Sequence, residues 1–118
     1  MDAAQLKRDA EKSRLLKRLA ELMVEEQRAA GVFEEVPHYS VLEDAAHELG
    51  RQVSQASQQR AAAEVAARSV ATAACPGCGE RSPTVLKKRI VASLDGEVEL
   101  VEPAAFCPAC RRAFFPSA

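Results

Sequence analysis

Two pairs of closely spaced cysteines constrain this chain more than any other feature. Cys75 and Cys78 enclose Pro-Gly, Cys107 and Cys110 enclose Pro-Ala, and the chain has no other cysteine. Two residues between thiols let both sulfurs of a tight turn point at one ion, and two such turns complete a tetrahedral four-sulfur site. Thiolate ligands with no open position favour one structural Zn²⁺ ion, with iron as the alternative.

Two other roles are open to cysteine pairs of this kind. Disulfides require an oxidising compartment, and the N-terminal segment 1–5 lacks the apolar stretch of a signal peptide. A redox pair would follow a strand at the start of a helix, and a second copy would have no purpose. No segment approaches the roughly 20 apolar residues that cross a bilayer. We therefore expect a cytoplasmic chain with a metal site and no membrane partner.

Length and composition limit the size of any core. The chain has 118 residues, 4% aromatic residues and no tryptophan. These values fit one small domain, or a helical region followed by a very small domain. The formal net charge is −1, so the chain as a whole has no electrostatic attraction for nucleic acid or an anionic membrane.

The first part of the chain reads as a helix over about 3–30. Asp2 can cap its start, and apolar residues at helical spacing are densest between Leu15 and Val24. Gly31 is a natural end because glycine accepts the left-handed conformation that follows many helices. Residues 31–39 form the expected linker.

A second helix is expected over about 40–72, completing a helical region 1–73. Ser40 and Glu43 can form a capping box at its start. The expected apolar face contains Leu42, Ala45, Ala46, Leu49, Val53 and Ala56, and continues weakly through Ala63, Ala66 and Val70. Two long helices with a short link can form an antiparallel hairpin, or they can provide a dimerisation seam.

The composition changes at Cys75, where glycine, proline and β-branched residues replace alanine and glutamine. The stretch 84–93 is rich in strand formers, and Asp95-Gly96 is a strong hairpin signal. Pro103 must lie at an edge or a bulge because it cannot donate to a sheet. A hairpin between two cysteine turns predicts a zinc ribbon over 74–118, and so small a segment needs its metal to fold. The expected fold class is α+β.

Basic residues lie beside both cysteine pairs. Between residues 75 and 118 the sequence has six Lys and Arg against five Asp and Glu. If these cations share a face, they can contact phosphates; otherwise they form a solvated surface balanced by Glu97, Glu99 and Glu102. The candidate nucleic-acid contacts are Arg81, Lys87, Lys88, Arg89, Arg111 and Arg112.

The remaining residues with chemical potential give no sign of an active site. We expect Phe114 and Phe115 to cover the metal site and the hairpin, with stacking on a nucleic-acid base as the alternative. His38 and His47 are not needed as metal ligands, and no motif places a nucleophile beside either. No glycine-rich phosphate loop is present. The chain is therefore expected to be non-catalytic and without a small-molecule substrate.

The ribbon and its flanks resemble the N-terminal region of a family of bacterial insertion-sequence transposases. The resemblance covers about residues 40–116. It rests on the hairpin 90–100, on the run Cys-Pro-Ala-Cys-Arg-Arg-Ala-Phe-Phe-Pro over 107–116, and on the helical segment 42–51. In that family a helical segment precedes a four-cysteine zinc ribbon. The chain departs from the pattern at 103–105, where Pro-Ala-Ala replaces basic and aromatic residues.

The resemblance implies binding to DNA at transposon ends or at the target. It assigns Cys75, Cys78, Cys107 and Cys110 as metal ligands and carries over no catalytic residue, because the family's nuclease domain lies downstream of the matching region. A truncated, split or repurposed transposase piece would fit. The competing hypothesis is a protein-interaction or dimerisation adaptor in which the ribbon is a structural clip. An enzyme acting through its thiols is a third and weaker one.

Overall fold

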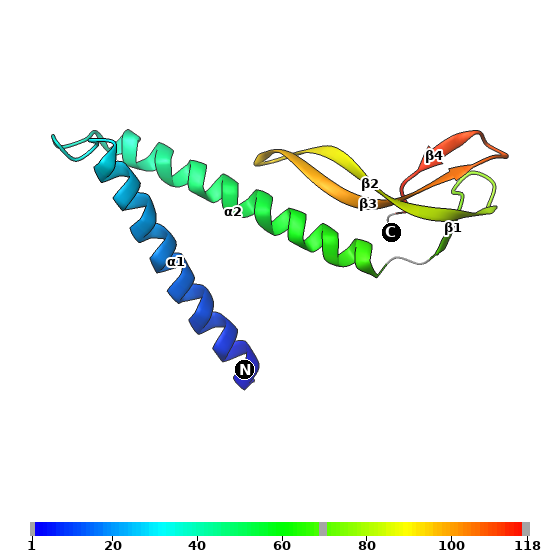
Figure 1. Cartoon of the computed structure of the whole chain (residues 1–118), viewed down its shortest axis with the longest axis horizontal. Coiled ribbons are helices and arrows are strands. Elements are labelled where there is room, and N and C mark those ends of the chain that lie inside the picture. Colours follow the sequence, from blue (N-terminus) through cyan, green and yellow to red (C-terminus); the bar gives the residue numbers. More distant parts are fainter. Residues whose placement is uncertain (1, 69–70, 117–118) are drawn as a thin grey trace. The chain divides into compact units, whose positions relative to one another are not determined.

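The computed structural model describes residues 2–68 and 71–116, and it confirms an α+β chain in which two helices precede a small antiparallel sheet (Figure 1). The elements in chain order are α1 (Ala3–Ala29), α2 (Tyr39–Ala67), β1 (Thr72–Ala74), β2 (Arg81–Ser93), β3 (Gly96–Cys107) and β4 (Arg112–Phe114). The residues group into two compact units, Met1–Asp44 and Ala45–Ala118. This division falls inside α2 and not at residue 73.

Both ends of α1 form as expected. The carboxylate of Asp2 accepts a 2.7 Å hydrogen bond from the backbone N–H of Gln5, which satisfies one of the free donors at the helix start. At the other end Gly31 has a φ of 82°. The N–H of Gly31 bonds the carbonyl of Arg28, and the N–H of Val32 bonds the carbonyl of Gln27. These two bonds form a Schellman motif, which stops the helix.

The start of α2 does not contain the expected capping box of Ser40 and Glu43. The helix begins at Tyr39, so Ser40 already lies inside its first turn and is not the capping residue. His38 precedes the helix, and its ring Nδ1 accepts a 3.2 Å hydrogen bond from the backbone N–H of Ser40. An imidazole nitrogen therefore satisfies the Ser40 N–H, which the expected capping box assigned to the Glu43 carboxylate.

The end of α2 also differs from the expectation. The helix ends at Ala67 and does not continue to residue 72; residues 69–70, including Val70, lie outside the described residues. Thr72 belongs to β1, whose three residues pair with the first residues of β2. Ala73 and its partner Ser82 are both buried. Sheet pairing and burial thus override the helical preference of the alanine-rich sequence.

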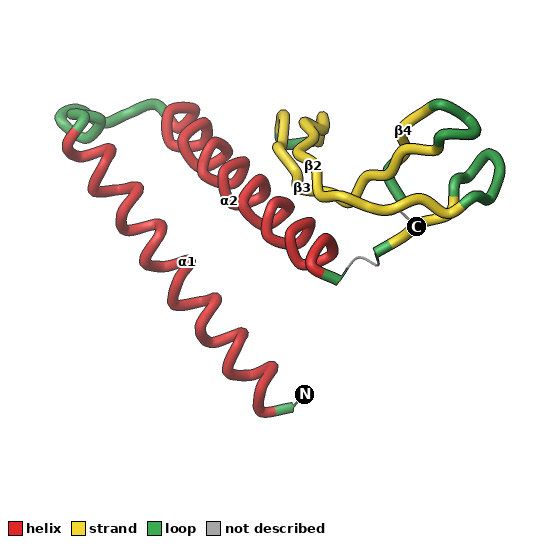
Figure 2. Tube along the Cα trace, turned by 45° about the vertical axis from the view of Figure 1, so that its right-hand side comes forward, coloured by secondary structure: helices red, strands yellow, loops and turns green. Residues whose placement is uncertain are grey.

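The sheet is built around one long hairpin. All strands are antiparallel, in the order β1-β2-β3-β4. Figure 2 draws the long hairpin of β2 and β3 in yellow. β2 and β3 pair in continuous register from Thr84 opposite Ala105 to Ser93 opposite Gly96. The short strands β1 and β4 pair only near the ends of β2 and β3 that carry the cysteines. The cysteine end of the sheet therefore has four strands, and the opposite end has two.

The hairpin turn lies one residue earlier than the Asp95-Gly96 signal indicates. Ser93 pairs with Gly96, so Leu94 and Asp95 form the turn and Gly96 is the first residue of β3. Gly96 has a φ of 96°, which explains why glycine is needed directly after the turn. Pro103, as expected, lies where β3 has an open edge, because β4 pairs only from Ala105 onward.

The core is small and lies mostly around the cysteines. Val98 is 1% exposed and Cys107 is 0% exposed. The other buried residues have small side chains, namely Ala66, Ala73, Cys75, Ser82, Ala104 and Ala105. A core of this size removes little apolar area from water, so it stabilises the sheet weakly without further help.

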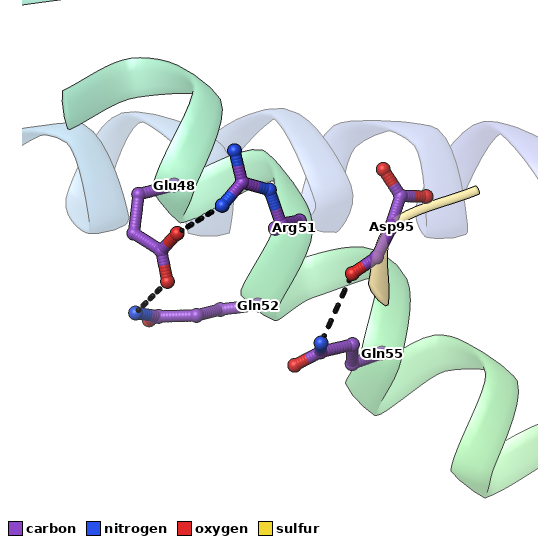
Figure 3. A network of polar contacts seen from close by, with 5 residues as sticks. All are labelled: Glu48, Arg51, Gln52, Gln55 and Asp95. Carbon is purple, nitrogen blue, oxygen red and sulfur yellow. Dashed lines mark hydrogen bonds and ion pairs between the residues drawn. The ribbon is translucent and has the colours of Figure 1, made fainter. Parts of the chain in front are cut away.

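The tip of the hairpin is hydrogen-bonded to α2. The hydroxyl of Ser54 donates a 2.6 Å bond to the Asp95 carboxylate, and the amide of Gln55 donates a 3.1 Å bond to the Asp95 carbonyl. Figure 3 shows Gln55 pointing at Asp95, while Gln52 and Arg51 bond Glu48 on the same helix.

The covered side of α2 differs from the predicted apolar face. It contains Ser54, Gln55, Gln58, Ala62 and Ala66, each of which is buried or half-buried. Of the predicted face, Ala66 is buried and Ala45, Leu49 and Ala63 are half-buried. Val53, by contrast, is 43% exposed. The contact with the hairpin is polar at its tip, which hydrophobic periodicity cannot detect.

Candidate metal centre

The structure brings all four cysteine sulfurs together. The Cys75 and Cys110 sulfurs are 3.8 Å apart, and the Cys78 and Cys107 sulfurs are 3.5 Å apart. All four lie within 4.8 Å of one another, and all four thiols are free. Both of these contacts join sulfurs of different pairs, so the two cysteine turns face each other across one point.

This arrangement fits a tetrahedral metal ion. A regular four-sulfur site with Zn–S bonds of about 2.3 Å has sulfurs about 3.8 Å apart, and the distances of 3.8 and 3.5 Å between the turns lie near that value. Four sulfur donors with no oxygen or nitrogen ligand suit Zn²⁺ or iron and disfavour Mg²⁺ and Ca²⁺. The chain therefore holds a closed four-cysteine cluster that is compatible with a structural metal site.

The two cysteine turns share one backbone design. In the first, the N–H of Gly79 bonds the carbonyl of Cys75 at 2.9 Å; in the second, the N–H of Arg111 bonds the carbonyl of Cys107 at 2.7 Å. The first sulfur of each pair also accepts a backbone N–H, from Gly77 at 3.3 Å and from Cys110 at 3.4 Å. Such N–H donors fix the orientation of the ligands and stabilise negative charge on sulfur.

Each turn then needs one residue in the left-handed conformation. Gly79 has a φ of 79°, and Arg111, at the same position of the second turn, has a φ of 56°. Arg111 is the one non-glycine residue with positive φ among those described. Side chains at such positions are strained by roughly 1 kcal/mol or more. The second turn therefore carries an arginine where glycine would be easier to accommodate.

Burial and charge make the four thiols unequal. Cys75 and Cys107 are buried, Cys110 is half-buried and Cys78 is exposed. Hydrogen bonds from the backbone N–H groups of Cys78 and Gly77 lower the pKa of Cys75 to about 6. The neighbouring sulfurs of Cys78 and Cys75 raise the pKa of Cys110 to about 12. The first thiolate thus forms easily, whereas the repulsion among several thiolates calls for a cation between them.

Three of the six candidate nucleic-acid contacts are held by neighbours within the ribbon. The Arg81 guanidinium donates to the hydroxyl and carbonyl oxygens of Thr72 at 3.0 and 2.9 Å. Lys88 forms a 3.7 Å ion pair with Glu99. Both Lys88 and Glu99 are mostly exposed, so their pairing contributes little to stability.

Arg89 is the most tightly held of these three. It forms a 2.7 Å ion pair with the half-buried Glu102, and its guanidinium lies 4.4 Å from the centre of the Phe115 ring. Phe115 therefore packs against the hairpin, in agreement with the expected covering role. Because side chains alternate along a strand, Lys88 projects from the opposite face of β2 to Lys87 and Arg89. The expected basic cluster is thus divided between two faces.

The side chains of the other three cations have no ion pair or hydrogen bond to any described residue. They are Lys87, Arg111 and Arg112. Arg112 belongs to the second turn, but its guanidinium lies 2.9 Å from the position that a Cβ at Gly77 would occupy. Glycine in the first turn therefore leaves space for this arginine. These three cations are available to an anionic partner.

A groove of about 530 Å³ lies at the cysteine end of the sheet. Arg81 and Lys87 line it together with Phe106 and Phe115. Phe106 is 56% exposed, which is unusual for an aromatic side chain next to a small core. An aromatic ring beside cationic side chains can stack on a nucleic-acid base.

Two structural roles could not be read from the sequence. Thr72, at the end of the predicted helix, is the partner of Arg81. Asp95, taken as a turn residue, also binds Ser54, which lies 41 positions earlier in the chain. Neither pairing leaves a local signal, because the partners are brought together only by the register of the sheet and by the docking of its tip.

Two further observations concern membrane spans and similarity to known proteins. Within residues 2–68 and 71–116, neither helix is long and apolar enough to cross a membrane. Comparison of the chain with protein-family models, curated proteins and solved structures gave no match.

Proposed function

We propose that the four cysteines bind one structural Zn²⁺ ion, and that the ribbon so formed is a non-catalytic DNA-binding module like the N-terminal region of an insertion-sequence transposase. The sulfur cluster supports the first part. The core around it is small, so metal binding supplies folding free energy that packing lacks. We prefer Zn²⁺ over iron because a closed four-cysteine site is the usual form of a structural zinc site.

One observation carries the second part of the proposal. Arg111 keeps a left-handed conformation where the matching residue of the first turn is glycine. Strain of this kind commonly marks functional positions. The side chain of Arg111 also has no hydrogen bond or ion pair to the described residues, and the same holds for the side chains of Lys87 and Arg112. An arginine in a conformation that suits glycine, with its guanidinium free, supports a role in binding phosphate.

The size of the expected effect follows from the number of free cations. Three phosphate contacts give a salt slope of about −2.7, so affinity should fall about 40-fold between 50 and 200 mM salt. Arg81, Lys88 and Arg89 should add little, because protein groups already bind them. This is a modest interface, in keeping with a module that positions a larger assembly.

The test combines metal analysis with DNA binding on one purified sample. We expect one Zn²⁺ per chain, and binding to duplex DNA that weakens with salt at the slope given above. One Zn²⁺ with no DNA binding at 50 mM salt would refute the DNA module and leave the interaction adaptor. Absence of bound metal after purification with added Zn²⁺ would refute the metal centre itself.

A further inference from the structure

Helix α1 presents an apolar face that is largely exposed, with only Leu19, Met23 and Gln27 of the helix half-buried. None of its residues, all of which the structure describes, is buried. Leu15, Leu19 and Leu22 follow one another at intervals of four and three residues, so they lie on one face of the helix. Leu15 is 49% exposed and Leu22 is 40% exposed. We call these three residues the leucine stripe; a stripe of this kind on a long helix needs a partner.

Charge along α1 is divided between its two halves. Segment 7–18 carries six Lys and Arg against two acidic residues, whereas segment 19–29 carries three Glu against one Arg. The helix therefore has a basic N-terminal half and an acidic C-terminal half. The leucine stripe lies where these halves meet. Such a helix is complementary to a copy of itself that runs in the opposite direction.

The same charges disfavour the obvious partner within the chain. An antiparallel hairpin would place the acidic segment 19–29 beside segment 39–51, which carries three acidic residues against one Arg. It would also place the basic half of α1 beside segment 52–63, whose one charged residue is Arg60. A parallel pair of α1 helices would align basic with basic and acidic with acidic. Like charges at such distances are destabilising.

We propose that α1 pairs with α1 of a second copy of this chain, in antiparallel orientation about a two-fold axis. The basic half of each helix then lies beside the acidic half of the other, and the two leucine stripes pack together at the centre. A helix of 27 residues is about 40 Å long, long enough for several turns of contact. The interface is isologous, because one surface meets its own copy.

The first test measures the oligomeric state of the full chain with Zn²⁺ present, by sedimentation equilibrium over a range of concentrations. We expect a dimer that Leu22→Asn weakens about tenfold or more, since a polar group replaces an apolar one in the seam. Leu6→Asn is the matched control: Leu6 is also exposed on α1, but lies about 160° around the helix from Leu22. Equal weakening by both variants, or a monomer at every concentration, would overturn the proposal.

The second test determines orientation. Lys12 lies in the basic half and Glu25 in the acidic half, at nearly equal distances from Leu19, so an antiparallel dimer brings Lys12 of one copy opposite Glu25 of the other. Lys12→Glu alone should weaken the dimer, and Lys12→Glu with Glu25→Lys on the same chain should restore it. In a parallel dimer these residues meet their own copies, so the double substitution would bring no recovery.

Isotope labelling separates contacts between copies from contacts within one helix, such as the ion pair of Lys12 with Asp9 at 3.7 Å. A mixture of ¹⁴N- and ¹⁵N-labelled chains is treated with a carbodiimide, which joins lysine amines to carboxylates. We expect mixed-isotope cross-links between Lys12 and the acidic half, at Glu25 or Glu26. Mixed cross-links confined to residues of the same half would show a parallel dimer and refute the proposal. Metal content and DNA binding are measured separately, so failure here leaves the proposed function unaffected.

Discussion

Gly79 and Arg111 occupy the same position in the two cysteine turns, directly after the second cysteine of each, and both have positive φ. The N–H of each bonds the carbonyl four residues earlier. The two turns thus have one conformation and differ in how easily their sequences adopt it. A Cβ at Gly79 would have no neighbour within 4 Å, so the difference lies in the backbone alone.

This relationship predicts opposite effects of two substitutions on stability. Arg111→Gly should raise the free energy of unfolding by about 0.5–1 kcal/mol, because it removes the strain of a side chain at positive φ. Gly79→Ala should lower it by about 1 kcal/mol for the same reason. Urea unfolding of the Zn²⁺-loaded chain, followed by NMR signals of the sheet, measures both.

The same Arg111→Gly variant should bind DNA less tightly, with a salt slope smaller by about 0.9. Higher stability together with weaker DNA binding is the expected pattern for a residue kept for function. An Arg111→Gly variant with wild-type DNA affinity would remove Arg111 from the interface.

Loss of one exposed ligand should unfold the ribbon. Cys78 is exposed, so replacing it would change stability by no more than about 0.5 kcal/mol if it were an ordinary surface residue. As a metal ligand, Cys78→Ser should abolish stoichiometric Zn²⁺ binding and the dispersed NMR signals of the sheet, while most of the helical circular dichroism remains. A chelator should produce the same state in the wild-type chain. A Cys78→Ser chain with full metal content would show that the ligand assignment is wrong.

The pairing of the lysines predicts which of them contacts DNA. The side chain of Lys87 has no partner among the described residues, whereas Lys88 is paired with Glu99 and projects from the other face of β2. Lys87→Ala should reduce DNA affinity and lower the salt slope by about 0.9. Lys88→Ala, a neighbouring change of the same size and charge, is the control and should have little effect. Equal effects of the two substitutions would favour a diffuse attraction over a defined interface.

The contact between Ser54 and Asp95 should stabilise the hairpin tip. A hydroxyl that donates to a carboxylate in a half-buried place contributes about 1–2 kcal/mol. Ser54→Ala and Asp95→Ala should each lower the free energy of unfolding of the sheet by about that amount. The loss in the double variant should be smaller than the sum.

Hydrogen exchange at the hairpin tip measures this effect locally. Gln52→Ala is the control, because Gln52 lies on the same helix and bonds only Glu48 among the described residues. Strictly additive losses in the Ser54 and Asp95 variants would show that the two side chains do not interact in solution.

The sequence alone determined the parts of this protein that depend on local chemistry. The spacing of Cys75 and Cys78, and of Cys107 and Cys110, predicted a shared four-sulfur site, because ligand geometry is fixed within each tight turn. Asp2 and Gly31 marked the ends of α1, since helix ends depend on a few neighbouring residues. The turn near Gly96 could be located, but its register moved by one residue once the pairing of β2 and β3 was known.

Only the tertiary structure decided which residues act on one another over long distances in the chain. Thr72 lies in a strand and not in the predicted helix, and Ser54 is hydrogen-bonded to Asp95. The tertiary structure also separated the cations into those held by Thr72, Glu99 and Glu102 and those left free. Pairing register and docking depend on residues far apart in sequence, and the free energies involved leave no periodic pattern in the chain.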